Sequence, residues 1–315
     1  MEPTEYIWQN GEFVPWDEAR VHVLTHGLHY GTGVFEGVRC YNTEQGPAIF
    51  RGRDHMKRLH TSGKLYYMDL EYTPEQLLEI TKDLITRNGL TDCYIRPFAF
   101  RGYGEIGLFP LNSKIEYSIA VWEWASYLGD EGKKNGIRAK ISSWRRMSPA
   151  SFIPQAKASG QYLNSVLAKI ESHHAGYQEA ILMDENDYVC EGSGENIFVV
   201  KDGKIATPSL ANSILQGINR DSVMQIATDM GIPVVERNVT RTELVTADEV
   251  FMTGTAAELV PVREIDDQLI GDPGPITRQL QAKFDDALYG RAPEYNEWLD
   301  FVGSPQPVTK DAAQV

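Results

Sequence analysis

A segment rich in glycine and charge divides the chain into two long stretches, and this division constrains the fold most strongly. Gly129, Gly132 and Gly136 stand among charged residues there. Such a composition is typical of a linker, because it neither packs into a core nor continues a regular element. The predicted units are a smaller N-terminal domain, a linker and a larger C-terminal domain, at residues 1–126, 127–136 and 137–302. Residues 303–315 lack hydrophobic periodicity, so we expect a disordered tail.

Both stretches mix predicted strands with predicted helices. In the first, Asn10-Gly11 is a strong turn signal for a hairpin over residues 6–14, and Thr73-Pro74 begins a helix. Further strands are expected at 38–41, 48–51, 93–103 and 114–124, and a further helix at 54–68. In the second, strands are expected at 137–142, 179–184, 188–191, 196–200, 249–253 and 260–265, and helices at 162–174, after Gly217 and at 276–288. The fold class is therefore α+β or α/β, with an α+β first domain and a β-rich second domain that carries helices.

Composition excludes several classes of function. The 315 residues are 42% apolar and 23% charged, as in an ordinary globular protein, and the net charge of -14 excludes a nucleic-acid partner. No apolar run approaches the ~20 residues of a membrane span, and the start lacks the pattern of a signal peptide, so we expect a cytoplasmic protein. Three widely spaced cysteines and three clustered histidines, at 22, 26 and 29, lack zinc-site spacing, so we expect reduced thiols and no metal.

One lysine, Lys157, lies in a stretch that favours a rigid loop. Pro154 precedes it and Gly160 follows it, after an aromatic and basic lead-in and before a helical run. We predict that Lys157 carries a cofactor, and that the cations Arg145 and Arg146 favour the neutral amine this requires. Taken alone, the lysine is better explained as a solvated surface charge, and the two arginines are equally well explained by surface pairing.

Two other blocks supply what a pyridoxal phosphate enzyme needs besides its lysine. Glu191 ends a predicted strand before Gly-Ser-Gly, a backbone that can approach a flat ring, so its carboxylate is a candidate partner for the ring nitrogen. The alternative is a β-turn with two exposed glutamates. Tyr94 and Arg96 share one face of a predicted strand and suit a carboxylate, although a structural pair explains them equally well.

Candidate phosphate ligands come from three places in the sequence. Gly217-Ile218-Asn219 precedes a predicted helix, where free N–H groups and the helix dipole favour an anion. Thr255, in a Gly-Thr-Ala turn after a strand, can add a hydroxyl and an N–H group, and Arg58 can add a charge. Such anion sites are common and do not by themselves name the ligand.

Together these blocks resemble the fold-type IV (class IV) pyridoxal phosphate aminotransferases, and are most similar to the branched-chain amino acid aminotransferases. The resemblance covers nearly the whole chain, through YIWQNGEFVPW, HGLHYGTGVFEGVR, YIRP, AKASGQYLNS, EGSGENIF, LQGINR and VFMTGTAAE. It implies a two-domain fold like that of D-amino acid aminotransferase, with the cofactor between the domains. Two positions depart from the pattern: one residue fewer separates Ile153-Pro154 from Lys157 than is often found, and Asn219 stands where threonine is common.

The resemblance also implies roles for individual residues. Lys157 matches the lysine that binds the cofactor, Tyr162 the tyrosine bonded to its phenolic oxygen, and Glu191 the carboxylate on its ring nitrogen. The phosphate and ring are expected at Arg58, Leu215, Gly217, Ile218, Asn219 and Thr255. The α-carboxylate clamp is expected at Tyr94, Arg96 and the backbone of Thr255 and Ala256. The substrate side-chain pocket is expected at Phe35, Gly37, Trp124 and Tyr127, with Tyr30 from the partner subunit. A homodimer is the minimum assembly expected, and a higher oligomer remains open.

The implied activity is transfer of the amino group from L-leucine, L-isoleucine or L-valine to 2-oxoglutarate by a ping-pong mechanism, with Arg39 as a candidate for the second carboxylate of 2-oxoglutarate. A D-amino acid or (R)-amine transaminase of the same fold remains open, as does aminodeoxychorismate lyase. From a different class, the chain could be a noncatalytic protein that binds a phosphate ligand. Tyr94 and Arg96 favour the L-amino acid enzyme.

Overall fold

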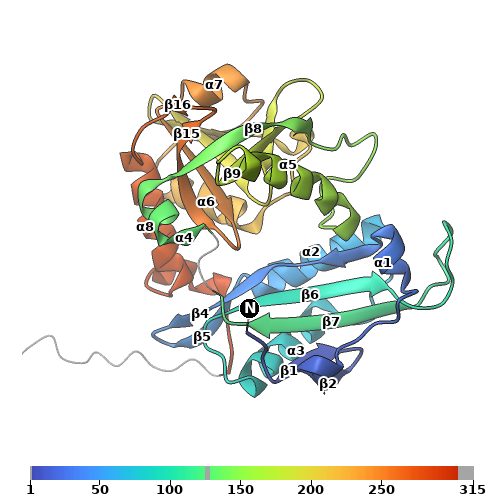
Figure 1. Ribbon diagram of the computed structural model, residues 1–315. Helices are drawn as coiled ribbons and strands as arrows, with labels where there is room; N and C mark the ends of the chain where they lie inside the picture. Colours follow the sequence, from blue (N-terminus) through green and yellow to red (C-terminus); the bar gives the residue numbers. More distant parts are fainter. Residues whose placement is uncertain (1, 125–127, 304–315) are drawn as a thin grey trace, which may run out of the picture.

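The computed structural model describes residues 2–124 and 128–303, which form two domains, each built on one β-sheet (Figure 1). Among these residues the first sheet has eight strands, in the order β17-β5-β4-β6-β7-β1-β2, with β3 paired to β6. Its strands are β1 (Tyr6–Gln9), β2 (Glu12–Pro15), β3 (Gly33–Phe35), β4 (Val38–Thr43), β5 (Gly46–Phe50), β6 (Cys93–Arg101), β7 (Ile115–Trp122) and β17 (Leu299–Phe301). The predicted hairpin at Asn10-Gly11 is confirmed, because both turn residues have positive φ and join β1 to β2.

The core of the first domain lies between this sheet and two helices. They are α2 (Gly52–Leu65) and α3 (Pro74–Arg87), and a shorter α1 (His26–Tyr30) lies at the far end of β6 (Figure 1). Thr73 caps α3 as predicted, since its side chain accepts from the Gln76 N–H group while the Gln76 side chain accepts from the Thr73 N–H group. Leu59 of α2 and Leu84 of α3 are buried against the sheet.

The second domain is a closed barrel with helices around it. Among the described residues its sheet has nine strands: β8 (Ile137–Arg145), β9 (Glu179–Met183), β10 (Val189–Gly192), β11 (Asn196–Lys201), β12 (Lys204–Thr207), β13 (Val234–Glu236), β14 (Glu249–Gly254), β15 (Glu258–Ile265) and β16 (Gln268–Leu269). The path β10-β9-β8-β15-β14-β11 is closed by a pairing of β10 with β11, and that pairing consists of Glu191 and Asn196. The barrel interior is apolar.

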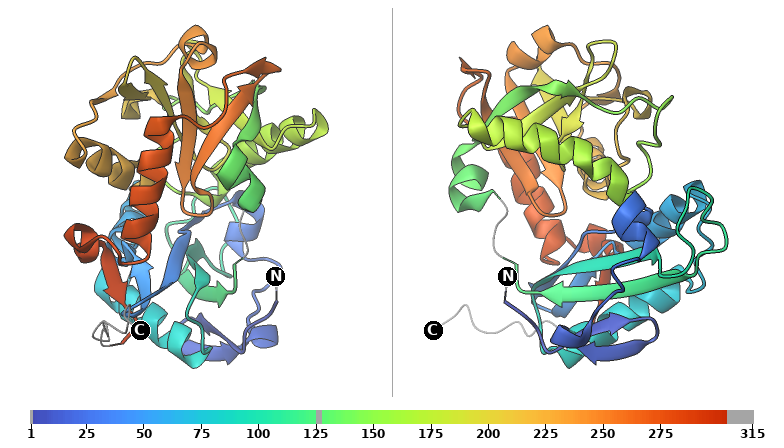
Figure 2. Two further views of the ribbon diagram at one scale, coloured as in Figure 1. Left: turned by 90° about the vertical axis from the view of Figure 1, so that its left-hand side faces the viewer. Right: turned by 45° about the vertical axis from the view of Figure 1, so that its right-hand side comes forward.

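In the described part of the chain, five α-helices accompany the barrel: α4 (Gly129–Asn135), α5 (Tyr162–His174), α6 (Ile218–Asp229), α7 (Arg241–Val245) and α8 (Pro275–Leu288). The bounds of α5 agree with the predicted helix at 162–174. Figure 2 shows α8 beside the barrel, with its C-terminal end toward the first domain. Leu280 and Phe284 of α8 share a buried cluster with Phe50 of β5, and the rings of Phe50 and Phe284 meet edge to face at 5.7 Å. The domains are therefore joined by an apolar core.

The observed elements differ from the predicted division of the chain in two respects. Strand β17, which we assigned to the second domain, pairs with β5 in the first sheet, with Leu299 opposite Phe50. Within the predicted linker, α4 packs on β15. The alternation of Leu299, Asp300 and Phe301 in β17 is too short to predict a strand. Residues 304–315, most of the predicted tail, lie outside the described residues.

Among the described residues no helix has the length and apolar character that crossing a membrane requires. The three cysteines are free and buried, as expected for reduced thiols.

Replacement of Leu280 with alanine should lower the free energy of unfolding by about 2–5 kcal/mol, because the side chain is fully buried in the cluster that both domains share. Urea denaturation measures this change. Leu269→Ala is the matched control, since that leucine is 76% exposed and its truncation should change the free energy by less than about 0.5 kcal/mol. Equal effects of the two substitutions would contradict a shared core at Leu280.

Candidate active site

Lys157 lies at the contact between the two domains. It belongs to the loop between β8 and α5, yet its flanking residues Ala156 and Ala158 are buried in the core of the first domain. The Lys157 N–H group donates to Ser62 Oγ at 3.0 Å, and its carbonyl accepts from the Phe35 N–H group at 3.0 Å. The second half of the chain supplies this lysine, and the first domain fixes its backbone.

The side chain of Lys157 opens into a cavity with an empty volume of about 490 Å³. The cavity brings together every residue that we predicted to bind the cofactor: Arg58, Lys157, Tyr162, Glu191, Leu215, Gly217, Ile218, Asn219 and Thr255. Lys157 Nζ donates to Tyr162 Oη at 2.7 Å, and the rings of Phe35 and Tyr162 lie 4.8 Å apart. Tyr162 reaches the amine because it begins α5, after a short 3-10 helix that follows the lysine.

Glu191 is buried where β10 and β11 close the barrel. Its carboxylate forms an ion pair with Arg146 at 2.8 Å and accepts from Asn196 Nδ2 at 3.1 Å and the Leu215 N–H group at 3.0 Å. Burial raises the pKa of Glu191, and the charge of Arg146 opposes that rise. Of the two arginines that we expected near the lysine, Arg146 forms its ion pair with Glu191. Arg145 instead forms an exposed ion pair with a surface aspartate.

The start of α6 supplies an anion-binding end to the cavity. Gly217 is the N-cap of this 12-residue helix, so main-chain N–H groups of its first turn have no partner within the helix. A Cβ at Gly217 would lie 1.9 Å from Asn196 Oδ1, so only glycine fits there. The Thr253 hydroxyl in the same cavity is buried and has no hydrogen-bond partner among the described residues. An amine, a buried carboxylate and an anion-binding helix start suit pyridoxal phosphate.

Glu36 was not predicted from the sequence, yet it holds a residue of the cavity lining, Arg58. Its fully buried carboxylate accepts from Arg58 Nε at 2.7 Å, from Arg58 Nη2 at 2.8 Å and from His55 Nδ1 at 2.7 Å. Burial by itself would raise the pKa of Glu36, but the charges of Arg58 and His55 hold it well below its usual range. The two hydrogen bonds from Arg58 to Glu36 fix the guanidinium so that Arg58 Nη1 donates to the Gln216 carbonyl at 2.8 Å. The sequence signal for this role is a glutamate in a stretch, residues 33–38, that is otherwise apolar or glycine.

Of the residues predicted to bind the substrate, Phe35 lies beside the lysine, with its ring centre 5.1 Å from Lys157 Nζ, and others follow from it through side-chain contacts. The Arg96 guanidinium lies 4.9 Å from the Phe35 ring, and Arg96 Nη2 donates to Tyr94 Oη at 3.3 Å. The Tyr94 and Trp124 rings lie 4.5 Å apart. A Cβ at Gly37 would come within 2.1 Å of Tyr94 Oη, so glycine there leaves room for the phenol.

Four predicted substrate residues lie elsewhere or are not described. Arg39 forms ion pairs with Asp92 and Glu258, at 2.9 and 3.8 Å, which does not favour a role in binding a second substrate carboxylate. Ala256 lines a neighbouring cavity. Tyr30 is 42% exposed on α1, and Tyr127 lies outside the described residues. The described residues contain no cluster of His, Cys, Asp and Glu placed to hold a metal ion.

A second buried acid, Glu195, lies at the edge of the cavity beside Glu179. Burial and the charge of Glu179 raise the pKa of Glu195 to about 8, and Lys169, which is paired with Glu179, opposes the rise. The folded protein therefore holds a proton on Glu195 that the unfolded chain releases above its usual carboxyl pKa, about 4.3. The free energy of unfolding should consequently fall as pH rises from about 4.3 to 8.

Glu195→Gln should remove this pH dependence, because the amide is neutral at every pH. We expect the melting temperature of the variant, relative to the parent, to be higher at pH 9 than at pH 6. Calorimetry across this range measures the difference. Glu297→Gln, at an exposed position, is the control and should show no such trend. A difference between Glu195→Gln and the parent that is the same at both pH values would contradict the assignment.

Comparison with known proteins shows the family of this chain. Residues 33–265 match the model of the amino-transferase class IV family. The chain is 45% identical to a branched-chain-amino-acid aminotransferase of Escherichia coli, over 95% of this chain and 97% of that protein. It is 43% identical to a protein of the same name from Pseudomonas aeruginosa, over 94% of this chain and 97% of that protein.

Solved structures give the same result. A crystal structure of the Escherichia coli branched-chain amino acid aminotransferase superposes with a TM-score of 0.93 at 45% identity, covering 95% of this chain and all of that one. The crystal structure of the T.th. branched-chain amino acid aminotransferase with pyridoxamine 5'-phosphate superposes with a TM-score of 0.92 at 46% identity, covering 96% of this chain and all of that one. The predicted fold is thereby confirmed. The chain belongs to the class IV aminotransferase family.

Proposed function

We propose that this protein is a pyridoxal-phosphate-dependent aminotransferase that moves the amino group of L-leucine, L-isoleucine or L-valine to 2-oxoglutarate in two half-reactions. The observation that carries the proposal is the single cavity that joins the Lys157 amine, the buried Glu191 carboxylate and the start of α6. The named relatives support the choice of substrate. So do the ligands in structures of the T.th. enzyme, which include N-(5'-phosphopyridoxyl)-L-glutamate and 4-methylvaleric acid.

The residues around the lysine divide the work of proton transfer. When bound, pyridoxal phosphate supplies a ring that accepts the electron pair released from the substrate Cα. With cofactor and substrate bound, Lys157 Nζ would take the proton from Cα and return it on the other side of the reacting nitrogen, a general base step typically worth ~10²–10⁴-fold. Tyr162 Oη, at 2.7 Å, orients the amine, and Glu191 holds a proton on the ring nitrogen.

Binding of the cofactor and the substrate falls to the remaining residues of the site. Arg58, held by Glu36, and the first turn of α6 bind the phosphate. Tyr94, Arg96 and the backbone of the 255–256 turn bind the substrate carboxylate. Arg96 suits this task because, among the described residues, its guanidinium has no carboxylate partner and its Nε is buried without a hydrogen bond. Phe35 and Trp124 provide an apolar wall for a branched aliphatic side chain.

Lys157→Ala should abolish transamination and the adduct that borohydride traps on the protein, since the substitution removes the reacting amine. Lys201→Ala, on an exposed lysine, should leave both unchanged. For the parent, absorbance of the lysine-bound cofactor should be lost with L-leucine and L-valine but not with D-alanine or (R)-1-phenylethylamine. Reaction with the last two compounds would favour the D-amino acid or (R)-amine enzyme. Normal turnover by Lys157→Ala would refute the assignment.

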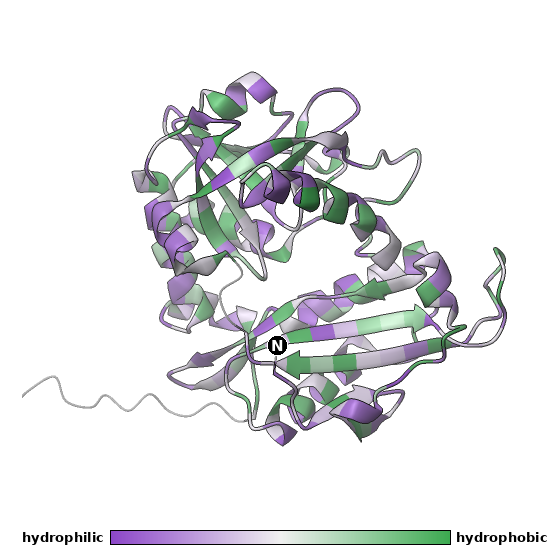
Figure 3. Ribbon diagram, viewed as in Figure 1, coloured by the Kyte–Doolittle hydropathy of each residue, from purple (hydrophilic) through white to green (hydrophobic). Residues whose placement is uncertain are grey.

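We further propose that the protein works as a homodimer through the exposed face of α5. Leu163, Val166, Leu167 and Ile170 are spaced to share one side of this helix and are 69, 48, 42 and 48% exposed. Figure 3 shows apolar segments along α5. A contiguous apolar helix face in water marks an interface. The family resemblance implies a second copy whose Tyr30 reaches the cavity, and we propose that this copy covers the face of α5.

Val166→Glu should convert a dimeric parent into monomers at micromolar concentration, because a charge would be buried in the interface. Sedimentation velocity measures the change. Val235→Glu is the matched control, since this valine is 47% exposed on β13, away from α5, and the variant should remain dimeric. A monomeric parent, or a dimer that survives Val166→Glu, would contradict this interface.

A further inference from the structure

The turn at residues 255–257 lies between two cavities. It joins β14 to β15, and the register pairs Gly254 with Glu258 across its base. Thr255 lines the cavity of the lysine, whereas Ala256 and Ala257 line a second cavity, with an empty volume of about 720 Å³, together with Trp124. The proposed function assigns the N–H groups of this turn to the substrate carboxylate. The position of the turn relative to β6, which carries Tyr94, then determines whether the two halves of that clamp fit one carboxylate.

Glu258, which follows the turn, has an unfavourable backbone conformation. Its φ is +59°, in the left-handed region that favours glycine and, next, asparagine and aspartate. A glutamate at such a position indicates that its side chain has a use that offsets the strain. The side chain is 11% exposed, so its carboxylate lies inside the protein.

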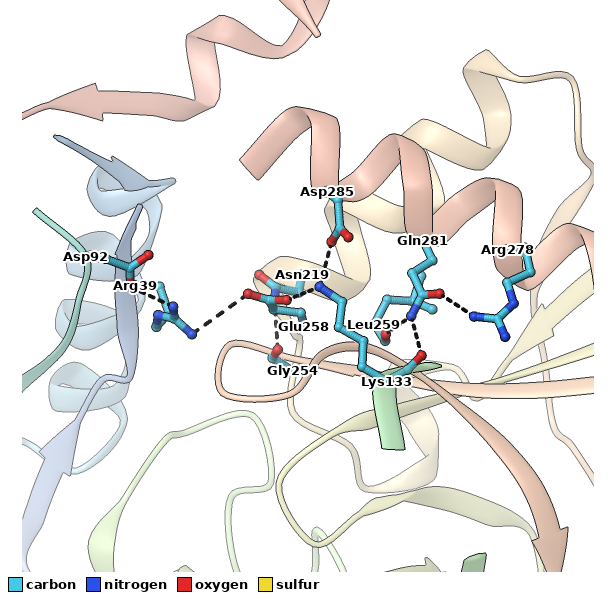
Figure 4. A network of polar contacts seen from close by, with 10 residues as sticks. All are labelled: Arg39, Asp92, Lys133, Asn219, Gly254, Glu258, Leu259, Arg278, Gln281 and Asp285. Carbon is cyan, nitrogen blue, oxygen red and sulfur yellow. Dashed lines mark hydrogen bonds and ion pairs between the residues drawn. The ribbon is translucent and has the colours of Figure 1, made fainter. Parts of the chain in front are cut away.

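The carboxylate of Glu258 is the centre of a row of charges that crosses the domain interface (Figure 4). Lys133 Nζ contacts one oxygen at 2.5 Å and Arg39 Nη1 lies 3.8 Å from the other. Lys133 is also paired with Asp285 at 3.0 Å, and Arg39 with Asp92 at 2.9 Å. We call these five residues the interdomain bridge. Arg39 lies on β4 and Asp92 precedes β6, whereas Glu258 and Asp285 belong to the second domain.

The bridge acts on both halves of the carboxylate clamp. On the first domain, Arg39 is paired with Tyr94 in the register of β4 and β6. On the second domain, Glu258 directly follows the turn as the first residue of β15. Strand β14, which precedes the turn, is held separately, because Asn219 Nδ2 donates a hydrogen bond to the Gly254 carbonyl at 3.0 Å. Asn219 also belongs to the first turn of α6, so the cofactor side of the turn does not depend on Glu258.

We propose that Glu258 is a positioning residue, which through Arg39 and Lys133 holds the 255–257 turn against β6 so that the two domains bind one substrate carboxylate. The inference rests on the proposed function. Arg39 then acts on the substrate through the turn and not by direct contact. Loss of the bridge should weaken binding of the carboxylate and leave binding of the cofactor unchanged.

Two substitutions at one position separate positioning from folding. Glu258→Gln removes the charge and keeps the strained backbone, and each cation keeps a carboxylate, Asp92 for Arg39 and Asp285 for Lys133. Glu258→Gly removes the charge and relieves the strain, so this variant should be at least as thermally stable as Glu258→Gln. Glu264→Gln is the matched control, because Glu264 is an ion-paired glutamate on the same strand, away from the turn.

The probe is 4-methylvaleric acid, which has the carbon skeleton of leucine and a carboxylate but no amine. Its dissociation constant from the holoenzyme should rise about tenfold in both Glu258 variants, because small displacements of a binding group cause large losses. The KM for L-leucine should rise in parallel while kcat changes less. The affinity for pyridoxal phosphate, measured by equilibrium dialysis, should stay within about twofold of the parent. Arg39→Gln added to Glu258→Gln should cause little further loss, since both remove the same bridge.

Either of two results would overturn the inference. The first is binding of 4-methylvaleric acid by both Glu258 variants within about twofold of the parent and of Glu264→Gln. The second is a loss of pyridoxal phosphate affinity as large as the loss of 4-methylvaleric acid affinity, which would indicate a general structural role. The proposed function is tested separately by the parent. A parent that does not transaminate L-leucine refutes that function, whereas an active parent with unaffected variants refutes only the bridge.

Discussion

The docking of the Lys157 loop on the first domain is the contact on which the site depends. Two main-chain bonds, to Phe35 and Ser62, and the burial of Ala156 and Ala158 attach this loop to a core that the other half of the chain builds. The position of the Lys157 amine depends on that attachment. A lysine side chain has four rotatable bonds, so its backbone must be fixed before its amine can be placed. The rest of the cavity comes mainly from the barrel.

The buried charges of the site are arranged in small neutralising groups. Glu36 is shared by Arg58 and His55, and Glu191 is paired with Arg146. Burial of any of these charges alone would be costly, so loss of one member of a group should destabilise its domain. The pairs also constrain orientation, because a guanidinium held in a fork has one direction in which its remaining N–H groups can point. The direction of the Arg58 guanidinium, which we propose binds the phosphate, is therefore set by a glutamate that follows β3, outside the cavity lining.

The sequence predicts those parts of the molecule that local chemistry determines. Thr73-Pro74 marks the start of α3 and Asn10-Gly11 the first hairpin, because caps and turns depend on adjacent residues. The ordered motifs predict the cavity residues through resemblance. The pairing of β17 with β5 and the partners of Arg39 could not be predicted, because both depend on contacts between residues more than 50 positions apart. An arginine in a strand has the same local signal whether it binds a substrate or an aspartate.

The pairing of Glu191 with Asn196 closes the barrel. The side chain of Asn196 also donates a hydrogen bond to the Glu191 carboxylate, which faces the cavity. Closure of the sheet therefore brings together two residues that line the cavity. A cofactor that binds at Glu191, as we propose, would bind the closed barrel. By mass action it shifts the folding equilibrium toward that state, which makes the cellular supply of the cofactor a determinant of how much folded protein is present.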